Sequence, residues 1–334
     1  MCGEFDRDET HAFLPRRQLT RRRFGCLALP ALMLPWLPGV ALADDGGTAL
    51  PLDLDEVAEG IHVHRGAIDL MRAGNDGAIA NIGFIVGREC VAVIDSGGSV
   101  REGRRLAAAV REVTDLPIRY VVNTHMHPDH VFGNAAFLGD KTVFVGHRNL
   151  AAALAARRES YLAANVELMG AELMKEVAIV PPTMPVDGTA VLDLGGRTLR
   201  LTAWPTAHTD NDLTVLDEAT GTLFAGDLVF LDHCPTFDGS LVGWLATLGA
   251  LQAIPAARLV PGHGPVQAAW PAAAVDTERY LSVLAKDVRA SIKQGQSLTV
   301  ALETAARSEA GRWQLFDEYN RRNATGAYAE LEWE

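Results

Sequence analysis

Three histidines and one aspartate fall within six residues of one another in the chain. The segment 124–130 reads THMHPDH and supplies His125, His127, Asp129 and His130. Imidazole and carboxylate groups suit Zn²⁺ and similar divalent ions. In an extended segment His125 and His127 point the same way, and Asp129 and His130 follow as the chain turns. One segment can therefore serve two adjacent metal positions, although a metal-free histidine cluster is the alternative.

Three more candidate ligands, His208, Asp227 and His263, follow later apolar runs. Asp227 comes directly after a predicted strand at 222–225, and His263 follows one at 258–260. A single histidine or aspartate in such a place is more often a turn residue. Their joint occurrence is more informative, because α/β folds place ligands at the ends of strands. The seven residues together predict a composite metal site.

The pattern of apolar residues predicts alternating strands and helices. We expect strands at 60–64, 79–86, 91–94, 118–122, 142–146, 190–194, 198–203, 213–216, 222–225 and 258–260. We expect helices at 99–114, 148–177 and 240–253, and a mostly helical stretch from 268 to about 322. This mixture indicates a layered α/β sandwich. The first strand is not followed by a Gly-x-Gly-x-x-Gly motif, which argues against a dinucleotide-binding fold.

The motif His-x-His-x-Asp-His after an apolar strand resembles the signature of the metallo-β-lactamase superfamily. The resemblance implies an αββα sandwich with a dinuclear site on one edge. The first metal ion would be held by His125, His127 and His208, the second by Asp129, His130 and His263, with Asp227 bridging the two. The cofactor would be two Zn²⁺, with Fe or Mn as alternatives, and a metal-bound hydroxide would be the nucleophile. Asp129, which can orient the attacking water, and Asp227 are the candidate catalytic residues.

Other residues near these motifs receive weaker interpretations. Asp95 matches a family position whose side chain supports the ligand histidines without binding the metal itself. The alternative is an aspartate that only caps a turn. A position in the substrate cleft is the less favoured interpretation of His233, and a structural role is the favoured interpretation of His147. Cys90 and Cys234 have no spacing that favours a disulfide.

The residue type at position 227 distinguishes branches of the superfamily. In the metallo-β-lactamases proper a cysteine, serine or similar residue occupies that position, whereas hydroxyacylglutathione hydrolases and lactonases carry the aspartate. The segments 80–87, 206–213, 238–244 and 330–334 resemble the quinoprotein relay system zinc metallohydrolases, which are similar to a sulfur-oxidation-associated branch. That resemblance implies a periplasmic setting beside a quinoprotein dehydrogenase or cytochrome c.

We therefore expect a metal-dependent hydrolase of an ester, thioester, lactone or related acyl bond in a small-molecule substrate. Three alternatives remain open: weak or promiscuous β-lactam hydrolysis, a non-catalytic metal-binding role in the maturation of a periplasmic quinoprotein, and iron-dependent persulfide dioxygenation.

The N-terminal residues have the composition of an export signal. Arginines at 21–23 resemble the twin-arginine motif, an apolar run covers 26–40, and Ala41-Leu42-Ala43 is a small-x-small cleavage signal. The alternative is an N-terminal membrane anchor. We expect a signal peptide at 1–43, a metallo-β-lactamase domain at 44–267, and a helical C-terminal extension at 268–334 packed on the same domain.

Residues 44–334 contain 24 basic and 38 acidic side chains, a formal net charge of −14. Because nucleic-acid binding depends on phosphate neutralisation by lysine and arginine, this charge argues against a nucleic-acid partner. We also expect no stable membrane anchor once the signal is removed.

Cleavage after Ala43 should leave a mature protein of 291 residues. N-terminal sequencing of the protein purified from the periplasm is expected to begin at Asp44, because the small-x-small motif ends there. A mature chain that begins near Met1 would contradict the export prediction.

Overall fold

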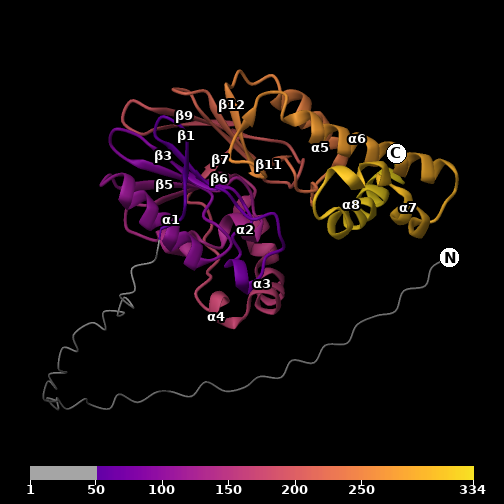
Figure 1. Ribbon diagram of the computed structural model, residues 1–334, viewed down its shortest axis with the longest axis horizontal. Coiled ribbons are helices and arrows are strands. Elements are labelled where there is room, and N and C mark those ends of the chain that lie inside the picture. Colours follow the sequence, from indigo (N-terminus) through magenta and orange to yellow (C-terminus); the bar gives the residue numbers. More distant parts are fainter. Residues whose placement is uncertain (1–50) are drawn as a thin grey trace, which may run out of the picture. The chain divides into compact units, whose positions relative to one another are not determined.

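The computed structural model describes residues 51–334. Residues 51–334 form one compact unit that contains two β-sheets and the helices that cover them (Figure 1). The predicted signal peptide at 1–43 lies outside the described residues.

The first sheet has seven strands, and its spatial order follows the chain. The strands are β1 (Asp55–Ala58), β2 (Ile61–His64), β3 (Ile82–Val86), β4 (Val91–Ile94), β5 (Ile118–Val122), β6 (Val143–His147) and β7 (Met184–Val186). Strands β1 to β4 pair antiparallel, whereas β4 to β7 pair in parallel. Parallel neighbours require crossovers. These contain the helices α1 (Val100–Val113), α2 (Pro128–Val131), α3 (Leu150–Met169) and α4 (Ala171–Met174).

The second sheet has six strands in the order β13-β12-β11-β10-β9-β8. They are β8 (Thr189–Asp193), β9 (Thr198–Ala203), β10 (Leu213–Asp217), β11 (Thr222–Phe230), β12 (Arg258–His263) and β13 (Ala268–Ala269). Only the β11–β12 pair is parallel, and α5 (Leu241–Leu251) lies in its crossover. The predicted metal ligands follow β5, lie in the loop between β9 and β10 and within β11, and end β12.

The apolar residues of the strands explain the layers. One buried cluster contains Ile61, Ile85 and Ile94 from the first sheet together with Leu201 and Val215 from the second, so the two sheets pack face to face. The other face of the first sheet packs on α1 through a separate cluster, and the other face of the second packs on α5 and the C-terminal helices. Strands buried on both faces read as continuous apolar runs, as β4 does. The predicted αββα sandwich is confirmed.

The C-terminal extension is helical, as expected. After β13 it contains α6 (Ala274–Lys293), α7 (Leu298–Thr304), the 3-10 helix η3 (Arg307–Arg312) and α8 (Phe316–Leu331), drawn in orange and yellow in Figure 1. These helices share one apolar core with β11 and α5. Glu330 of α8 accepts hydrogen bonds from the Ser240 hydroxyl and from the backbone N–H groups of Leu241 and Val242. A carboxylate at a helix N-terminus satisfies free donors, so α8 caps α5.

Several element boundaries differ from the prediction. Strand β11 continues to Phe230 instead of ending at residue 225, so Asp227 lies within the strand and not after it. The predicted helix at 148–177 is interrupted at Gly170, where φ is +83°. Strands β1, β7 and β13 were not predicted. Proline lacks the N–H of a strand ladder, but β7 tolerates Pro185 because it lies at the sheet edge.

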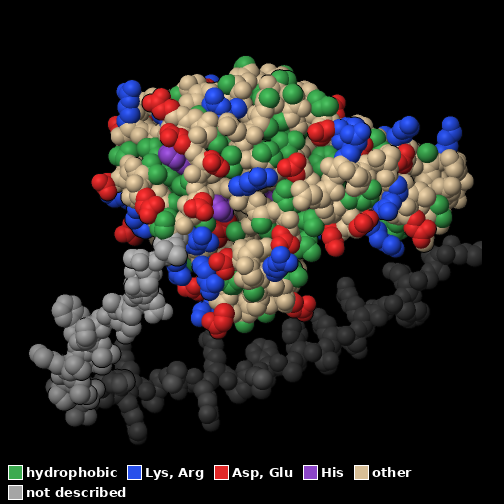
Figure 2. Space-filling view, in the orientation of Figure 1, with side chains coloured by type: hydrophobic (Ala, Val, Ile, Leu, Met, Phe, Trp, Pro, Cys, Tyr) green, Lys and Arg blue, Asp and Glu red, His purple; other side chains and the backbone are tan. Residues whose placement is uncertain are grey.

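Within residues 51–334, the structure contains no helix that is long and apolar enough to cross a membrane. Cys90 and Cys234 are buried free thiols. Acidic and basic side chains are interspersed over the face of the described residues shown in Figure 2.

An arginine links the two sheets at their edge. Arg197 donates from Nε and Nη2 to the two carboxylate oxygens of buried Asp217, at 2.8 and 3.0 Å. Its guanidinium also donates to the carbonyls of Glu59 and Val86, which belong to the first half of the chain. Burial raises the pKa of the Asp217 carboxyl, but hydrogen bonds from Arg197 and Thr220 outweigh burial and lower the pKa.

Arg197→Met should lower the free energy of unfolding by about 3–5 kcal/mol, because it leaves a buried carboxylate without its partner. The Asp217 contribution is present above the unfolded pKa of about 3.9 and is lost as the pH falls through the lower folded pKa. The difference between wild type and variant, measured by urea unfolding, should therefore shrink in acid. Arg200→Met, which removes a more exposed pair with Glu218, should cost less than about 1 kcal/mol. Equal effects of the two substitutions would contradict this account.

Candidate metal centre

The histidine motif occupies the loop between β5 and α2. Pro128 is the first residue of α2, a position that suits proline because its missing N–H would be unpaired there. Asn123, before the motif, and Asn134, after α2, exchange side-chain hydrogen bonds of 3.1 and 2.8 Å. These contacts join the two ends of the motif, in which His125 and His127 precede the helix and Asp129 and His130 lie on it.

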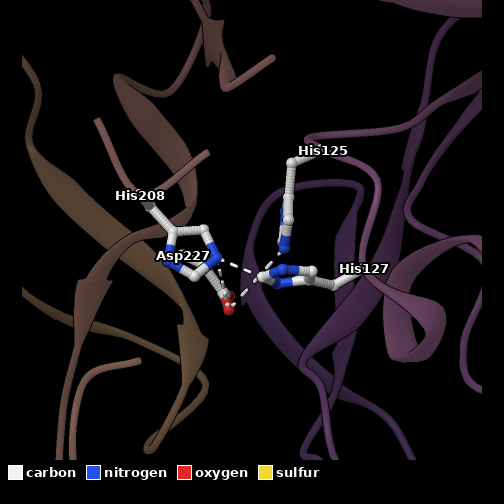
Figure 3. Close-up of side chains that lie close together, drawn as sticks. All are labelled: His125, His127, His208 and Asp227. Atoms are coloured by element: carbon white, nitrogen blue, oxygen red, sulfur yellow. Dashed lines mark hydrogen bonds and ion pairs between the residues drawn. The ribbon is translucent and has the colours of Figure 1, made fainter. Parts of the chain in front are cut away.

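The structure brings all seven predicted ligands together in two groups. Within each group the ligand atoms lie within 4.8 Å of one another. The first group consists of His125, His127, His208 and Asp227, and the second of Asp129, His130 and His263. Figure 3 shows the side chains of the first group converging from the two halves of the chain.

Asp227 lies between the two groups. Its Oδ2 is 3.5 Å from His208 Nε2 and 3.4 Å from His263 Nε2. Its Oδ1 is 3.3 Å from His130 Nε2. Burial raises the pKa of Asp227, but the surrounding histidines outweigh burial and lower it well below the ordinary value. One ionised carboxylate therefore faces both groups, as a bridging ligand would.

The orientation of the rings fits metal binding. His208 Nδ1 lies 2.7 Å from the Thr236 carbonyl, and His263 Nδ1 lies 2.9 Å from the Ile79 carbonyl. A carbonyl only accepts hydrogen bonds, so each Nδ1 carries a hydrogen, and each Nε2 can offer a lone pair to the centre when no proton is bound to it. The inward Nε2 atoms of His125 and His130 and Oδ1 of Asp227 are buried without a hydrogen-bond partner. Buried polar atoms normally have partners, so this donor set fits divalent ions.

The two groups differ in their affinity for protons. Burial and neighbouring histidines lower the pKa of His125, and burial lowers that of His208 to about 3. Burial also lowers the pKa of His263, but Asp227 and Asp129 outweigh it and raise the pKa to about 9. His125 and His208 therefore offer neutral imidazoles, whereas a metal bound at His263 must displace a proton.

Asp95 supports the histidine motif through hydrogen bonds and is not one of the seven predicted ligands. Its carboxylate accepts hydrogen bonds of 2.8 Å from the backbone N–H and the hydroxyl of Thr124, and its Oδ2 lies 2.8 Å from His130 Nδ1. The Thr124 hydroxyl lies 3.1 Å from His125 Nδ1. Both interpretations of the sequence therefore apply, because Asp95 orients a ligand histidine and also caps the loop. Its φ of +56° is one that aspartate and asparagine tolerate better than most residues.

Asp238 is a site residue that the sequence analysis missed. His127 directs Nδ1 toward His208 Nε2 at 3.1 Å, and its Nε2 lies 3.6 Å from Asp238 Oδ2. Burial raises the pKa of Asp238, but His127 outweighs burial and lowers the pKa to about 2. The residue lies in the 238–244 segment that carried the family resemblance, but nothing local to it indicated a contact 111 residues away in the chain.

His233 takes the less favoured of the two places that the sequence allowed, whereas His147 has the structural place that the sequence favoured. His233 is 2% exposed, and the centroid of its ring is 4.8 Å from that of His263, so it reaches the cleft. His147 is buried outside the seven-residue set and accepts a hydrogen bond from the backbone N–H of Asn149.

A cleft of about 350 Å³ opens over the second group and is lined by His127, Asp129, Asp227 and His263. This volume lies in the range of small-molecule sites. A larger and more open hollow of about 700 Å³ beside α8 contains none of the seven side chains.

Comparison with known proteins decides the family. A family model described as the metallo-beta-lactamase superfamily matches residues 75–263, a range that contains all seven clustered side chains. The chain belongs to the metallo-β-lactamase superfamily. The solved structures similar to this chain include a metallo-β-lactamase and an alkylsulfatase.

Solved structures support the fold of this superfamily member. A metallo-β-lactamase from Pontibacter korlensis is 19% identical, with a TM-score of 0.57 over 69% of this chain and 99% of that one. The sec-alkylsulfatase Pisa1 from Pseudomonas sp. is 14% identical, with a TM-score of 0.62 over 84% of this chain and 50% of that one. At these identities the likeness concerns the fold alone.

A curated relative matches over a shorter stretch. A linear primary-alkylsulfatase from Pseudomonas sp. (strain ATCC 19151) is 40% identical over 58 residues. The match spans 17% of this superfamily member and 11% of the alkylsulfatase, a small part of either protein.

Asp95→Asn should weaken metal binding by about 10- to 100-fold, because the amide is a poorer acceptor for His130 Nδ1. Asparagine tolerates the left-handed backbone, so the fold should persist. Competition with a chromogenic chelator measures the affinity. Asp115→Asn, at an exposed position between α1 and β5, is the matched control and should bind as the wild type does. An unchanged affinity in the Asp95 variant would contradict the supporting role.

Proposed function

We propose that this protein is a metal-dependent hydrolase of an ester, thioester, lactone or related acyl bond in a small molecule. The observation that carries the proposal is the position of the Asp227 carboxylate, which lies within 3.3–3.8 Å of four histidine nitrogens from both groups. A carboxylate shared in this way supports two neighbouring ions. The imidazole and carboxylate ligands suit Zn²⁺, and Fe or Mn are the alternatives.

The residues of the chain take separate roles in this proposal. When bound, the ions would supply a nucleophile at neutral pH and polarise the acyl oxygen. Asp129 lines the cleft, with Oδ2 3.3 Å from His263 Nε2. Burial raises the pKa of Asp129, but His130 and His263 outweigh burial and lower it to about 2. An ionised Oδ atom in the cleft can orient a water molecule by accepting its hydrogen.

The carboxylate at 227 favours acyl esters over β-lactams as substrates. Cys234 does not replace it, because the thiol lies in the apolar core around α5 and the C-terminal helices. Assay with a chromogenic cephalosporin tests the β-lactam alternative. Metal analysis that gave one iron per chain would favour the persulfide dioxygenase alternative.

Sulfate-ester hydrolysis is a second candidate. It is favoured by the 40% identity to a linear primary-alkylsulfatase over 58 residues. Release of sulfate from decyl sulfate separates it from acyl hydrolysis.

The proposed setting is the periplasm, with export by the twin-arginine route and a quinoprotein or cytochrome c as the partner. The residues at 21–43 and the resemblance to the quinoprotein relay family support this setting. Co-purification with and without a chelator tests the partner. It also tests the non-catalytic maturation role, because binding to a quinoprotein without any turnover would favour that role.

His125→Ala, or removal of metal by a chelator, should reduce acyl-ester hydrolysis by at least about 100-fold, because either change dismantles the first group. Activity should return on adding Zn²⁺ to the chelated wild type but not to the variant. His62→Ala, in a strand outside the site, is the matched control and should retain activity. Full turnover by the His125 variant would refute the proposal.

A further inference from the structure

One side of the cleft is built from a stripe along α3. Tyr161, Ala164, Asn165 and Leu168 all line the cleft. Their spacing of three, four and seven residues places them on one face of the helix. Leu70 and Met71, from the loop before η1 (Ala73–Asn75), line the same cleft. Met71 packs in the same apolar cluster as Tyr161, so loop and helix form one continuous wall.

This wall leaves large apolar side chains in contact with solvent. Leu70 is 39% exposed and Leu168 is 57% exposed. Apolar surface that is continuous with a binding cleft indicates a ligand that covers it. Val166, two residues from Leu168, is 42% exposed but does not line the cleft.

Two residues that line the cleft each carry a buried polar atom without a partner. Tyr161 Oη and His233 Nε2 are buried and have no hydrogen-bond partner. His233 Nδ1 lies 2.7 Å from the Cys234 carbonyl, which can only accept, so Nδ1 carries the hydrogen and Nε2 of the neutral ring is an acceptor. The Tyr161 hydroxyl can donate. Because buried polar groups are normally satisfied, these two atoms indicate the polar part of a ligand beside the second metal group.

We propose that the substrate is a medium-chain acyl ester. Its apolar chain lies along Leu70, Met71 and Leu168, and its ester group lies beside Asp129, within reach of Tyr161 Oη. In hydrolysis, water gives its hydroxyl to the acyl carbon and its other hydrogen to the leaving alcohol oxygen, as the carbon–oxygen bond breaks. This inference rests on the proposed acyl-hydrolase function and specifies its substrate class.

The test is a chain-length series with the zinc-loaded protein. Each buried methylene contributes to binding, so kcat/KM should rise at least about tenfold from p-nitrophenyl acetate to p-nitrophenyl octanoate. Leu168→Ser should lower kcat/KM for the octanoate by about fivefold or more and change that for the acetate by less than about twofold. The matched control, Val166→Ser on the same helix, should leave both values unchanged. Tyr161→Phe should lower kcat/KM for both esters.

A second readout separates this inference from the proposed function. Octanoate should bind the zinc-loaded protein at least about tenfold more tightly than acetate in calorimetric titration, and Leu168→Ser should remove the difference. If no ester is hydrolysed but octanoate still binds more tightly than acetate, the proposed acyl-hydrolase function is wrong, whereas the role of the apolar wall in binding the chain is confirmed. Equal binding of the two carboxylates, or acetate and octanoate esters turned over equally, would overturn the inference.

Discussion

The structure depends on the burial of two carboxylates among five histidines at one edge of a sandwich. Charged groups removed from water are tolerated only when they are paired. Asp227 meets this condition by facing histidines from both groups. Its place depends on two glycines. A Cβ at Gly262 would collide with the Asp227 carboxylate, and one at Gly226, where φ is +52°, would come within 2.7 Å of Thr124. Close backbone approach at these two positions lets the strand and the histidine loop share one small volume.

The two sheets are tied together at that same edge. Asn81 donates from its side chain to the Pro261 carbonyl at 2.9 Å and from its backbone to the Gly262 carbonyl at 2.7 Å. Ile79 offers its carbonyl to His263. The segment that leads into β3 therefore positions the end of β12, and the outer contacts of the ligands are part of the packing between the sheets. Because the same hydrogen bonds hold the ligands and the layers, the site and the fold are stabilised together.

The cleft over the centre combines two parts of the molecule with different character. The α3 stripe and the Leu70–Met71 loop contribute an apolar wall. The loop after β11 and the helix α8 contribute polar groups, including Tyr319 and Arg322. Asp238 connects these parts, because it lies near His127, 3.5 Å from Arg157 of α3 and 3.9 Å from Arg322 of α8. The C-terminal extension is therefore part of the wall of the cleft, and it is anchored by the Glu330 cap on α5.

The sequence by itself determined the layered fold, most strands and the seven residues that cluster. The histidine motif is local, and α1 lies within one residue of its predicted ends because its apolar spacing and Ser99 cap are local signals. Only the tertiary structure decided that β11 continues past Asp227, that Asp238 lies against His127, and that α3 and α8 line one cleft. Those features depend on contacts between residues far apart in the chain. No local spacing encodes such contacts, since they follow from how the sheets and helices pack.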